Sequence, residues 1–78
     1  MNKDLFESKW KQIRSQTPVW WGLMSSQDLE KVDKAEVKLI KYTTLLQVKY
    51  GYTREQARKE IVKRLKDYEF EQKAVENE

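Results

Sequence analysis

Residues 50–57, YGYTREQA, combine the signals of a helix end, a tight corner and a helix start. Gly51 stands where a helix C-terminus favours a positive φ, which glycine adopts without steric cost. Thr53 and Gln56 have the spacing of a capping box, in which two side chains bind backbone N–H groups at a helix start. Two helices joined by so short a corner must cross at a fixed angle and share a core. The pattern specifies a fold and no reaction.

Helical spacing continues on both sides of this corner. One helix is predicted over residues 35–50 and another over residues 54–69. The expected buried side of the long central segment comprises Val32, Leu39, Ile40, Thr43, Leu46 and Tyr50. The expected buried face of the second comprises Ala57, Ile61, Leu65 and Tyr68. Tyr50 and Tyr52 flank the corner and are expected to pack on opposite sides of it.

Two further helices are predicted over residues 3–14 and 26–33. Asn2 is the expected N-cap of the first, which carries an apolar stripe of Phe6, Trp10 and Ile13. Pro18 is expected to end that helix, leaving residues 19–24 as one helical turn or a connector.

The join between residues 26–33 and the long central helix leaves two alternatives. Asp33 and Glu36 have the spacing of a second capping box. Residues 26–50 therefore form either one long helix or two helices with a break near Asp33. The break is favoured, because helices in globular proteins average about a dozen residues.

Length and composition predict an all-α protein, a compact bundle of about four helices. The chain of 78 residues is expected to form one helical domain over residues 1–70, followed by a loose acidic tail over residues 71–78. No apolar run approaches the ~18 residues of a membrane span, and the N-terminus lacks the apolar stretch of a signal peptide. We therefore expect a cytoplasmic protein without a membrane partner.

Little catalytic chemistry is available in this sequence. It contains no histidine and no cysteine, which removes the commonest general base, the thiol nucleophile and most zinc sites. Gly22 and Gly51 are its two glycines, so no phosphate-cradling loop exists. The carboxylates adjoin lysines and arginines at the spacing of a solvated helix face. We expect no catalytic residue, no cofactor, no metal site and no small-molecule substrate.

Two groups of residues are candidates for an interaction surface. Trp20 and Trp21 are adjacent, so on a helix they point ~100° apart and cannot both face inward fully. They provide either core packing, which is favoured, or a stacking surface for nucleic acid or a protein. The second group is a basic stripe on the long central helix, formed by Lys34, Lys38, Lys41 and Lys49. Such a stripe can track phosphates, although a role in solubility is favoured.

The distribution of charge argues against strong nucleic-acid binding. Residues 54–66 contain six lysines and arginines against two glutamates, whereas residues 67–78 contain five carboxylates against Lys73. A dedicated binder of polyanions seldom ends in an acidic tail. We expect nucleic-acid binding that is weak at most.

Several motifs occur in a fixed order over residues 1–62. They are the opening MNKDLFESKWKQ, Trp21-Gly22 followed by Leu23, the helix start from Ser26 through Asp28 to Leu29, and YGYTREQA with Lys59-Glu60. Together they resemble the CsbD-like family of small bacterial general stress proteins. The resemblance implies a small cytoplasmic protein whose two helical hairpins pack across each other, with no catalytic or ligand-binding residue to carry over.

Two functional hypotheses remain open from the sequence. The first is a non-enzymatic stress-response protein that acts through abundance or through contacts with an unknown protein partner. The alternative is a weak nucleic-acid-binding helical domain that uses its lysine and arginine stripes and an exposed tryptophan. A strong salt dependence of DNA or RNA binding separates the two.

Overall fold

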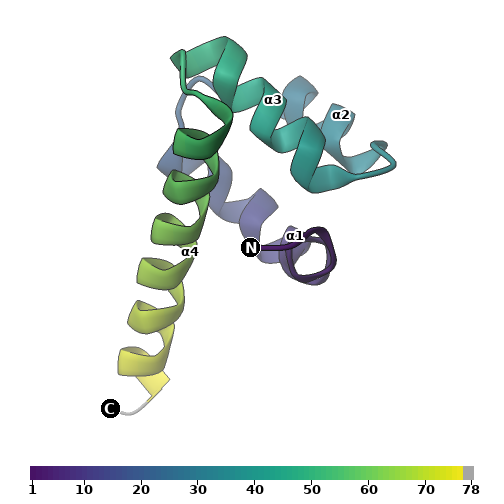
Figure 1. Ribbon diagram of the computed structural model, residues 1–78. Helices are drawn as coiled ribbons and strands as arrows, with labels where there is room; N and C mark the ends of the chain where they lie inside the picture. Colours follow the sequence, from purple (N-terminus) through teal and green to yellow (C-terminus); the bar gives the residue numbers. More distant parts are fainter. Residues whose placement is uncertain (77–78) are drawn as a thin grey trace.

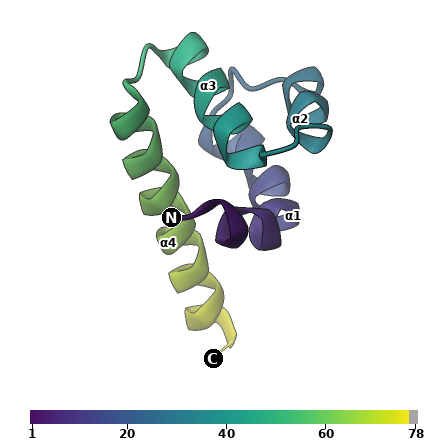
Figure 2. The ribbon, with the colours of Figure 1, turned by 45° about the vertical axis from the view of Figure 1, so that its right-hand side comes forward.

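A computed structural model describes residues 1–76, with side chains to residue 72, and these residues form helices and no strands. The helices are α1 (Lys3–Trp20), α2 (Ser26–Asp33), α3 (Lys38–Tyr50) and α4 (Arg54–Glu76). Helix α3 contacts each of the other three. In Figures 1 and 2, α4 leads away from the end of α3, α1 crosses beneath α3, and α2 lies beside α3. The predicted all-α bundle of four helices is confirmed.

The core takes apolar side chains from all four helices and from the α1–α2 connector. It comprises Phe6, Trp10, Ile13, Trp21, Met24, Leu29, Val32, Leu39, Tyr42, Leu46, Ala57, Ile61 and Leu65. The stripe predicted for α1 is confirmed, and on α4 the predicted Ala57, Ile61 and Leu65 are buried while Tyr68 is half-buried. On α3 the prediction for Ile40 is wrong, because Ile40 is 50% exposed and Tyr42 is fully buried instead, and the predicted Tyr50 is half-buried against the core. Leu39, Tyr42 and Leu46 share one helical face, and Ile40 lies about 100° away from Leu39.

Helix α1 starts where predicted, since the Asn2 side chain accepts a hydrogen bond from the Leu5 N–H at 2.8 Å. Its predicted end at residue 14 is wrong, because the helix continues through Pro18 to Trp20. Proline at this position removes the backbone N–H that would bond to the Arg14 carbonyl, and the helix ends two residues later. Thr17 supports this turn by donating its hydroxyl to the Ile13 carbonyl at 2.7 Å. The connector is correspondingly shorter than residues 19–24.

The central segment is broken at the favoured place, because α2 ends at Asp33. The second capping box is wrong, however, since α3 begins at Lys38 and its N-cap Val37 makes no side-chain capping bond. The carboxylate of Asp33 is occupied by α1 instead, where it accepts a hydrogen bond from Trp10 Nε1. A tertiary contact has therefore replaced the local cap that the sequence favoured.

The corner after α3 has the predicted geometry. Gly51 adopts φ 71°, and the Thr53–Gln56 capping box forms with bonds of 2.9 and 3.1 Å. The expectation that Tyr50 and Tyr52 point to opposite sides is wrong. Their rings stack with centroids 5.7 Å apart and planes at 15°. Both hydroxyls face the α1–α2 connector: the Tyr50 hydroxyl accepts a hydrogen bond from the Leu23 N–H at 2.9 Å, and the Tyr52 hydroxyl accepts one from Trp21 Nε1 at 3.4 Å.

Helix α4 runs to Glu76, beyond the predicted end near residue 69. Leu65 is its last buried residue among those whose side chains are described. The last turns of α4 extend beyond the other helices in both views (Figures 1 and 2). The limit of the domain at residue 70 and the looseness of the tail over residues 71–78 stay predictions, and residues 77–78 lie outside the described residues.

Candidate binding groove

The tryptophan pair of the predicted interaction surface is divided between core and edge. Trp21 is only 2% exposed, and the Arg64 guanidinium lies 4.6 Å above its ring. It packs edge-on against Tyr42, with ring centroids 6.0 Å apart. Trp20 is half-buried and meets Tyr68 edge-on at 6.2 Å. Trp21 therefore belongs to the core, where a large aromatic side chain fills a small bundle, and it cannot stack on a partner.

The predicted basic stripe is not continuous. Lys38 pairs with Glu7 at 3.0 Å, and Lys49 pairs with the buried Asp28 and also donates to the Leu23 carbonyl at 2.9 Å. Lys34 caps the end of α2, and Lys41 is exposed on α3. Two of the four lysines thus hold helices together, and the structure does not assemble the stripe with the two tryptophans into one surface.

Asp28 and Lys49 form a buried electrostatic link between α2 and α3. The Asp28 carboxylate also accepts hydrogen bonds from the N–H and the hydroxyl of Ser25, both at 2.9 Å. Burial raises the pKa of Asp28, but the hydrogen bonds from Lys49 and Ser25 outweigh it and hold this pKa below its usual value. A carboxylate with all these partners stabilises the fold and is not poised to transfer a proton.

Tyr42 is fully buried and brings its hydroxyl into the core. Its hydroxyl lies 2.7 Å from Thr17 Oγ1, and burial raises the pKa of this hydroxyl. Because Thr17 already donates to the Ile13 carbonyl, the Tyr42 hydroxyl is the donor between the two. The hydrogen bonds of Thr17 and Tyr42 are thus made within the core. Among residues 1–76, moreover, no group of three or more side chains is placed to hold a metal ion.

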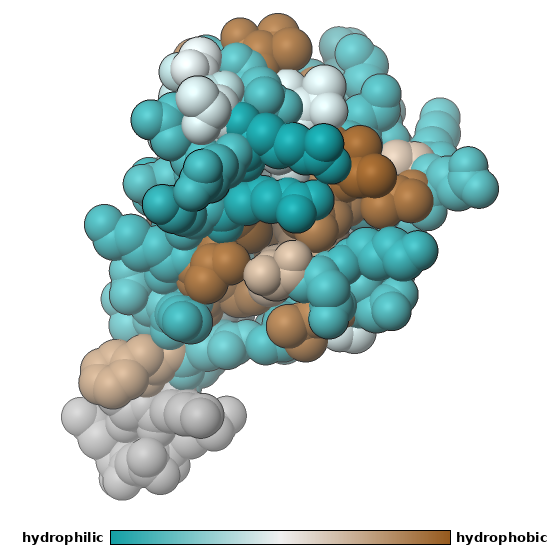
Figure 3. Space-filling view, in the orientation of Figure 1, coloured by the Kyte–Doolittle hydropathy of each residue, from teal (hydrophilic) through white to brown (hydrophobic). Residues whose placement is uncertain are grey.

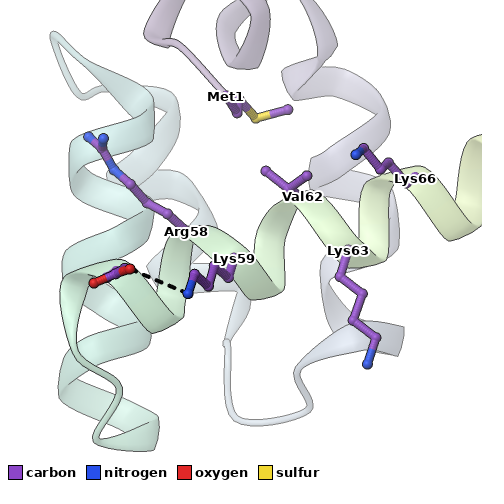
Figure 4. Close-up of a pocket in the computed structure, with 7 residues that line it drawn as sticks. Met1, Arg58, Lys59, Val62, Lys63 and Lys66 are labelled. Atoms are coloured by element: carbon purple, nitrogen blue, oxygen red, sulfur yellow. Dashed lines mark ion pairs between the residues drawn. The ribbon is translucent and has the colours of Figure 1, made fainter.

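A groove of about 500 Å³ runs between the N-terminal segment and α4. Its lining consists of Met1, Glu55, Arg58, Lys59, Val62, Lys63 and Lys66. Figure 4 shows Val62 pointing from α4 toward Met1, with Arg58 and Lys66 on its two sides. Figure 3 shows apolar side chains crossing the middle of the face that carries the N-terminus, between hydrophilic ones. The groove is thus an apolar floor bordered by cations.

Helical periodicity positions the cations of this groove. Arg58, Val62 and Lys66 are four residues apart on α4 and lie above one another on one face, while Lys59 and Lys63 follow one position further round. Met1 closes the groove from the other side and packs against the core. A second hollow of about 300 Å³ continues past Val62 to Leu5 and Leu65, beside the ion pair of Lys9 with Glu69.

The charge of the groove is largely uncompensated. Lys59 pairs with Glu55 at 3.3 Å, but these side chains are 75% and 80% exposed, so the pair contributes little. Arg58, Lys63 and Lys66 form no ion pair with any other residue of the described chain. The groove can therefore bind a ligand that is acidic and carries an apolar group.

The excess of cations over residues 54–66 is visible in the sequence, where it bears only on nucleic-acid binding. The sign that was missed is Val62, an apolar residue in the middle of the basic face. Met1 gives no comparable sign, because only the folding of the chain brings it beside α4. Among residues 1–76, no helix combines the length and apolar character needed to cross a membrane.

Several curated bacterial proteins are similar to this chain. A UPF0337 protein of Protochlamydia amoebophila is 37% identical over 60 residues, which cover 77% of this chain and 86% of the relative. This chain belongs to the UPF0337 family, the CsbD-like family. A UPF0337 protein of Bordetella pertussis is 33% identical over 78% of this chain and 88% of its own length. The UPF0337 protein YjbJ of Escherichia coli is 32% identical over 80% and 86%.

The family resemblance seen in the motifs is thereby confirmed for this CsbD-like chain. No family model matches it, and no solved structure matches it. The names of its UPF0337 relatives state no enzymatic activity, ligand or partner. Its function has to be argued from its own surface.

Proposed function

We propose that this CsbD-like chain is a small, non-enzymatic stress-response protein of the cytoplasm that acts by binding other proteins. The groove on α4 binds an acidic protein segment that carries an exposed apolar side chain. One observation supports this more than any other: Met1 and Val62 form an apolar floor, and Arg58, Lys63 and Lys66 border it without a carboxylate partner among the described residues. An apolar floor selects a side chain, and the surrounding cations select its acidic neighbours.

The mode of action is supported by the placement of the perturbed titratable groups. Asp28, Asp33 and Tyr42 have shifted pKa values, and each is bound by structural partners away from the groove. Enzymes concentrate such groups in clefts, where substrate reaches them. In this chain the cleft and the shifted groups are separate, which favours binding over catalysis.

Nucleic acid is the alternative partner, and the geometry favours it less. Proteins that bind single strands combine a basic groove with exposed aromatic side chains on which bases stack. Trp21 is buried, and the aromatic side chains Trp20, Tyr50 and Tyr52 do not line the groove. An apolar floor also gives no advantage with a phosphate backbone. We therefore propose nucleic-acid binding that is weak and strongly dependent on salt.

A peptide titration monitored by NMR tests the binding mode. One synthetic peptide is acidic with a central phenylalanine, and its control carries serine at that position. We expect the phenylalanine peptide to shift the signals of Val62 and of its neighbours on α4, and the serine peptide to bind more weakly. The double variant Lys63→Glu/Lys66→Glu should lose this response. The matched variant Lys34→Glu/Lys41→Glu changes charge equally at exposed positions outside the groove and should keep it.

Two results contradict the proposal. If neither peptide shifts residues of the groove, the groove is not a protein-binding site. If an oligonucleotide of mixed sequence binds there more tightly than the phenylalanine peptide at physiological salt, the alternative is correct. The stress role has its own test, since quantitative immunoblots of the host bacterium should show the protein rising several-fold under stress. A constant level across osmotic, acid and heat stress would refute that role.

A further inference from the structure

We propose that the segment bound in the groove belongs to a second copy of this chain, and that two α4 helices associate antiparallel. The segment is the acidic stretch around Phe70. This inference rests on the proposed function, since it requires the groove to accept an acidic segment with an apolar side chain, and it names that segment.

Phe70 is an apolar side chain without a place in its own domain. It is 74% exposed, and Leu65 is the last buried residue before it on α4. Phe70 lies just after the last residues of α4 that contact α1, Tyr68 and Glu69, and the last turns of α4 extend beyond the other helices (Figures 1 and 2). Asp67 and Glu71 flank Phe70 and form no ion pair with a described residue. Phe70 thus has the chemistry that the groove selects.

The spacing on α4 allows two such contacts at once. Val62 and Phe70 are eight residues apart, which is about 12 Å along the helix and about 80° around it. If two α4 helices cross antiparallel near Lys66, Phe70 of each copy lies over Val62 and Met1 of the other. The arrangement has two-fold symmetry and repeats the same contact, as in the commonest class of homodimer.

Charge fixes the antiparallel direction. Residues 60–66 contain three cations and one carboxylate, and residues 67–72 contain three carboxylates and no cation. Antiparallel pairing about Lys66 brings the first of these segments in each copy against the second in the other, whereas parallel pairing opposes like charges. Lys66 lies near the two-fold axis in each copy, so the two Lys66 side chains approach each other there and Asp67 of each copy adjoins them.

The expected association is weak and sensitive to salt. One pair of helices with two anchor side chains buries less than a standard protein interface of about 1,600 Å². The flanking ion pairs are exposed at the rim, so salt screens them. A monomer–dimer equilibrium should therefore appear at high protein concentration and weaken as salt increases.

Sedimentation equilibrium over a range of concentrations measures this association. Phe70→Ser should weaken it at least about tenfold, as the loss of an aromatic anchor does in other interfaces. The matched control Val48→Ser removes another exposed apolar side chain, on α3, and should leave the association unchanged.

A charge-swap pair makes the test specific to the geometry. Lys63→Glu/Lys66→Glu reverses the groove, and Asp67→Lys/Glu71→Lys reverses the segment. Each variant alone should stay monomeric, because like charges then face one another. Their equimolar mixture should associate, because both contacts of the mixed dimer again join opposite charges. Circular dichroism confirms that each variant is folded.

Contacts between the Phe70 ring of unlabelled protein and the Val62 methyl groups of labelled protein should appear in isotope-filtered NMR.

The outcomes separate this inference from the proposed function. If the chain is monomeric at all concentrations and the phenylalanine peptide still binds in the groove, the second-copy inference is wrong and the proposed function stands. If the chain associates and neither Phe70→Ser nor the charge swap affects it, the inference is also wrong. If self-association behaves as expected and no peptide binds the groove of Phe70→Ser, the groove serves dimerisation and the wider proposed function fails.

Discussion

Trp10 Nε1 donates a hydrogen bond of 2.7 Å to Asp33 Oδ1 and so joins the middle of α1 to the last residue of α2. Arg14, one turn further along α1, places its Nε 3.1 Å from each oxygen of the same carboxylate. The hydrogen bond from Trp10 holds the pKa of Asp33 below its usual value, and Arg14 adds to this effect against partial burial. The contact fixes where α2 ends against α1.

Replacing Asp33 by asparagine should weaken this junction. Asp33→Asn keeps the size of the side chain and removes its charge, so the bonds from Trp10 and Arg14 become weaker. We expect a loss of about 1 kcal/mol in unfolding free energy, modest because the carboxylate is partly exposed to water. Urea denaturation measures it, with Glu30→Gln on the exposed side of α2 as control. Equal losses in the two variants would show that the junction does not stabilise the fold.

Stability should fall in acid because of two carboxylates. The pKa values of Asp28 and Asp33 both lie below 3.8 in the folded protein. Well above pH 3.8 both groups are charged in the folded and unfolded states, and their stabilisation is fully present. As the pH falls through 3.8 and then through the lower folded values, the unfolded chain takes up protons first and stability is lost. Urea unfolding from neutral pH down to strong acid should show this decline, and it should be smaller in Asp28→Asn. Stability that stays level throughout the acid range would contradict the assignment.

The lysine partner of Asp28 should matter more than other lysines of α3. Lys49→Met keeps the aliphatic stem and removes the ammonium, which leaves the buried Asp28 carboxylate with Ser25 alone and the Leu23 carbonyl without this donor. We expect a loss of about 2 kcal/mol, the usual cost of leaving a buried charged group short of a partner. Lys41→Met, at an exposed position of the same helix, should cost little. Thermal or urea unfolding distinguishes them, and similar losses would refute a structural role for Lys49.

Local signals of the sequence predicted the parts of the fold that are decided locally. The caps at Asn2 and Thr53, the corner at Gly51 and the break after Asp33 each depend on residues a few positions apart. The errors occur where distant residues compete. Asp33 binds Trp10 instead of capping α3, and Pro18 stays helical because its turn is supported by the Thr17 hydroxyl in the core.

The candidate surface, too, could be predicted from the sequence only where neighbouring residues decide it. Sequence spacing identified the basic residues on α4, but it could not show that Trp21 turns inward under Arg64, or that Lys49 is held by Asp28. It also could not show that Met1 meets Val62, because these residues lie at distant positions and only tertiary packing joins them.

The two glycines offer a comparison in which packing is held constant. A Cβ atom added at Gly51 or at Gly22 meets no atom within 4 Å, so neither replacement by alanine creates a clash with a neighbour. The difference lies in the backbone alone. Gly51 has φ 71°, in the left-handed region, whereas Gly22 has no positive φ. An L-residue in the left-handed region is strained. Alanine at Gly22 meets no such strain, and its main effect is to reduce the conformational entropy of the unfolded chain.

Gly51→Ala should therefore destabilise the protein by about 1 kcal/mol, which corresponds to a fall of several degrees in Tm for a domain of this size. Gly22→Ala should leave Tm unchanged or slightly raised. Gly51→Asn should lie between wild type and Gly51→Ala, because asparagine tolerates the left-handed conformation better than alanine. Thermal melts followed by circular dichroism give the three values. Equal losses for the two alanine variants, or a larger loss at Gly22, would mean that the corner between α3 and α4 does not depend on the left-handed conformation of Gly51.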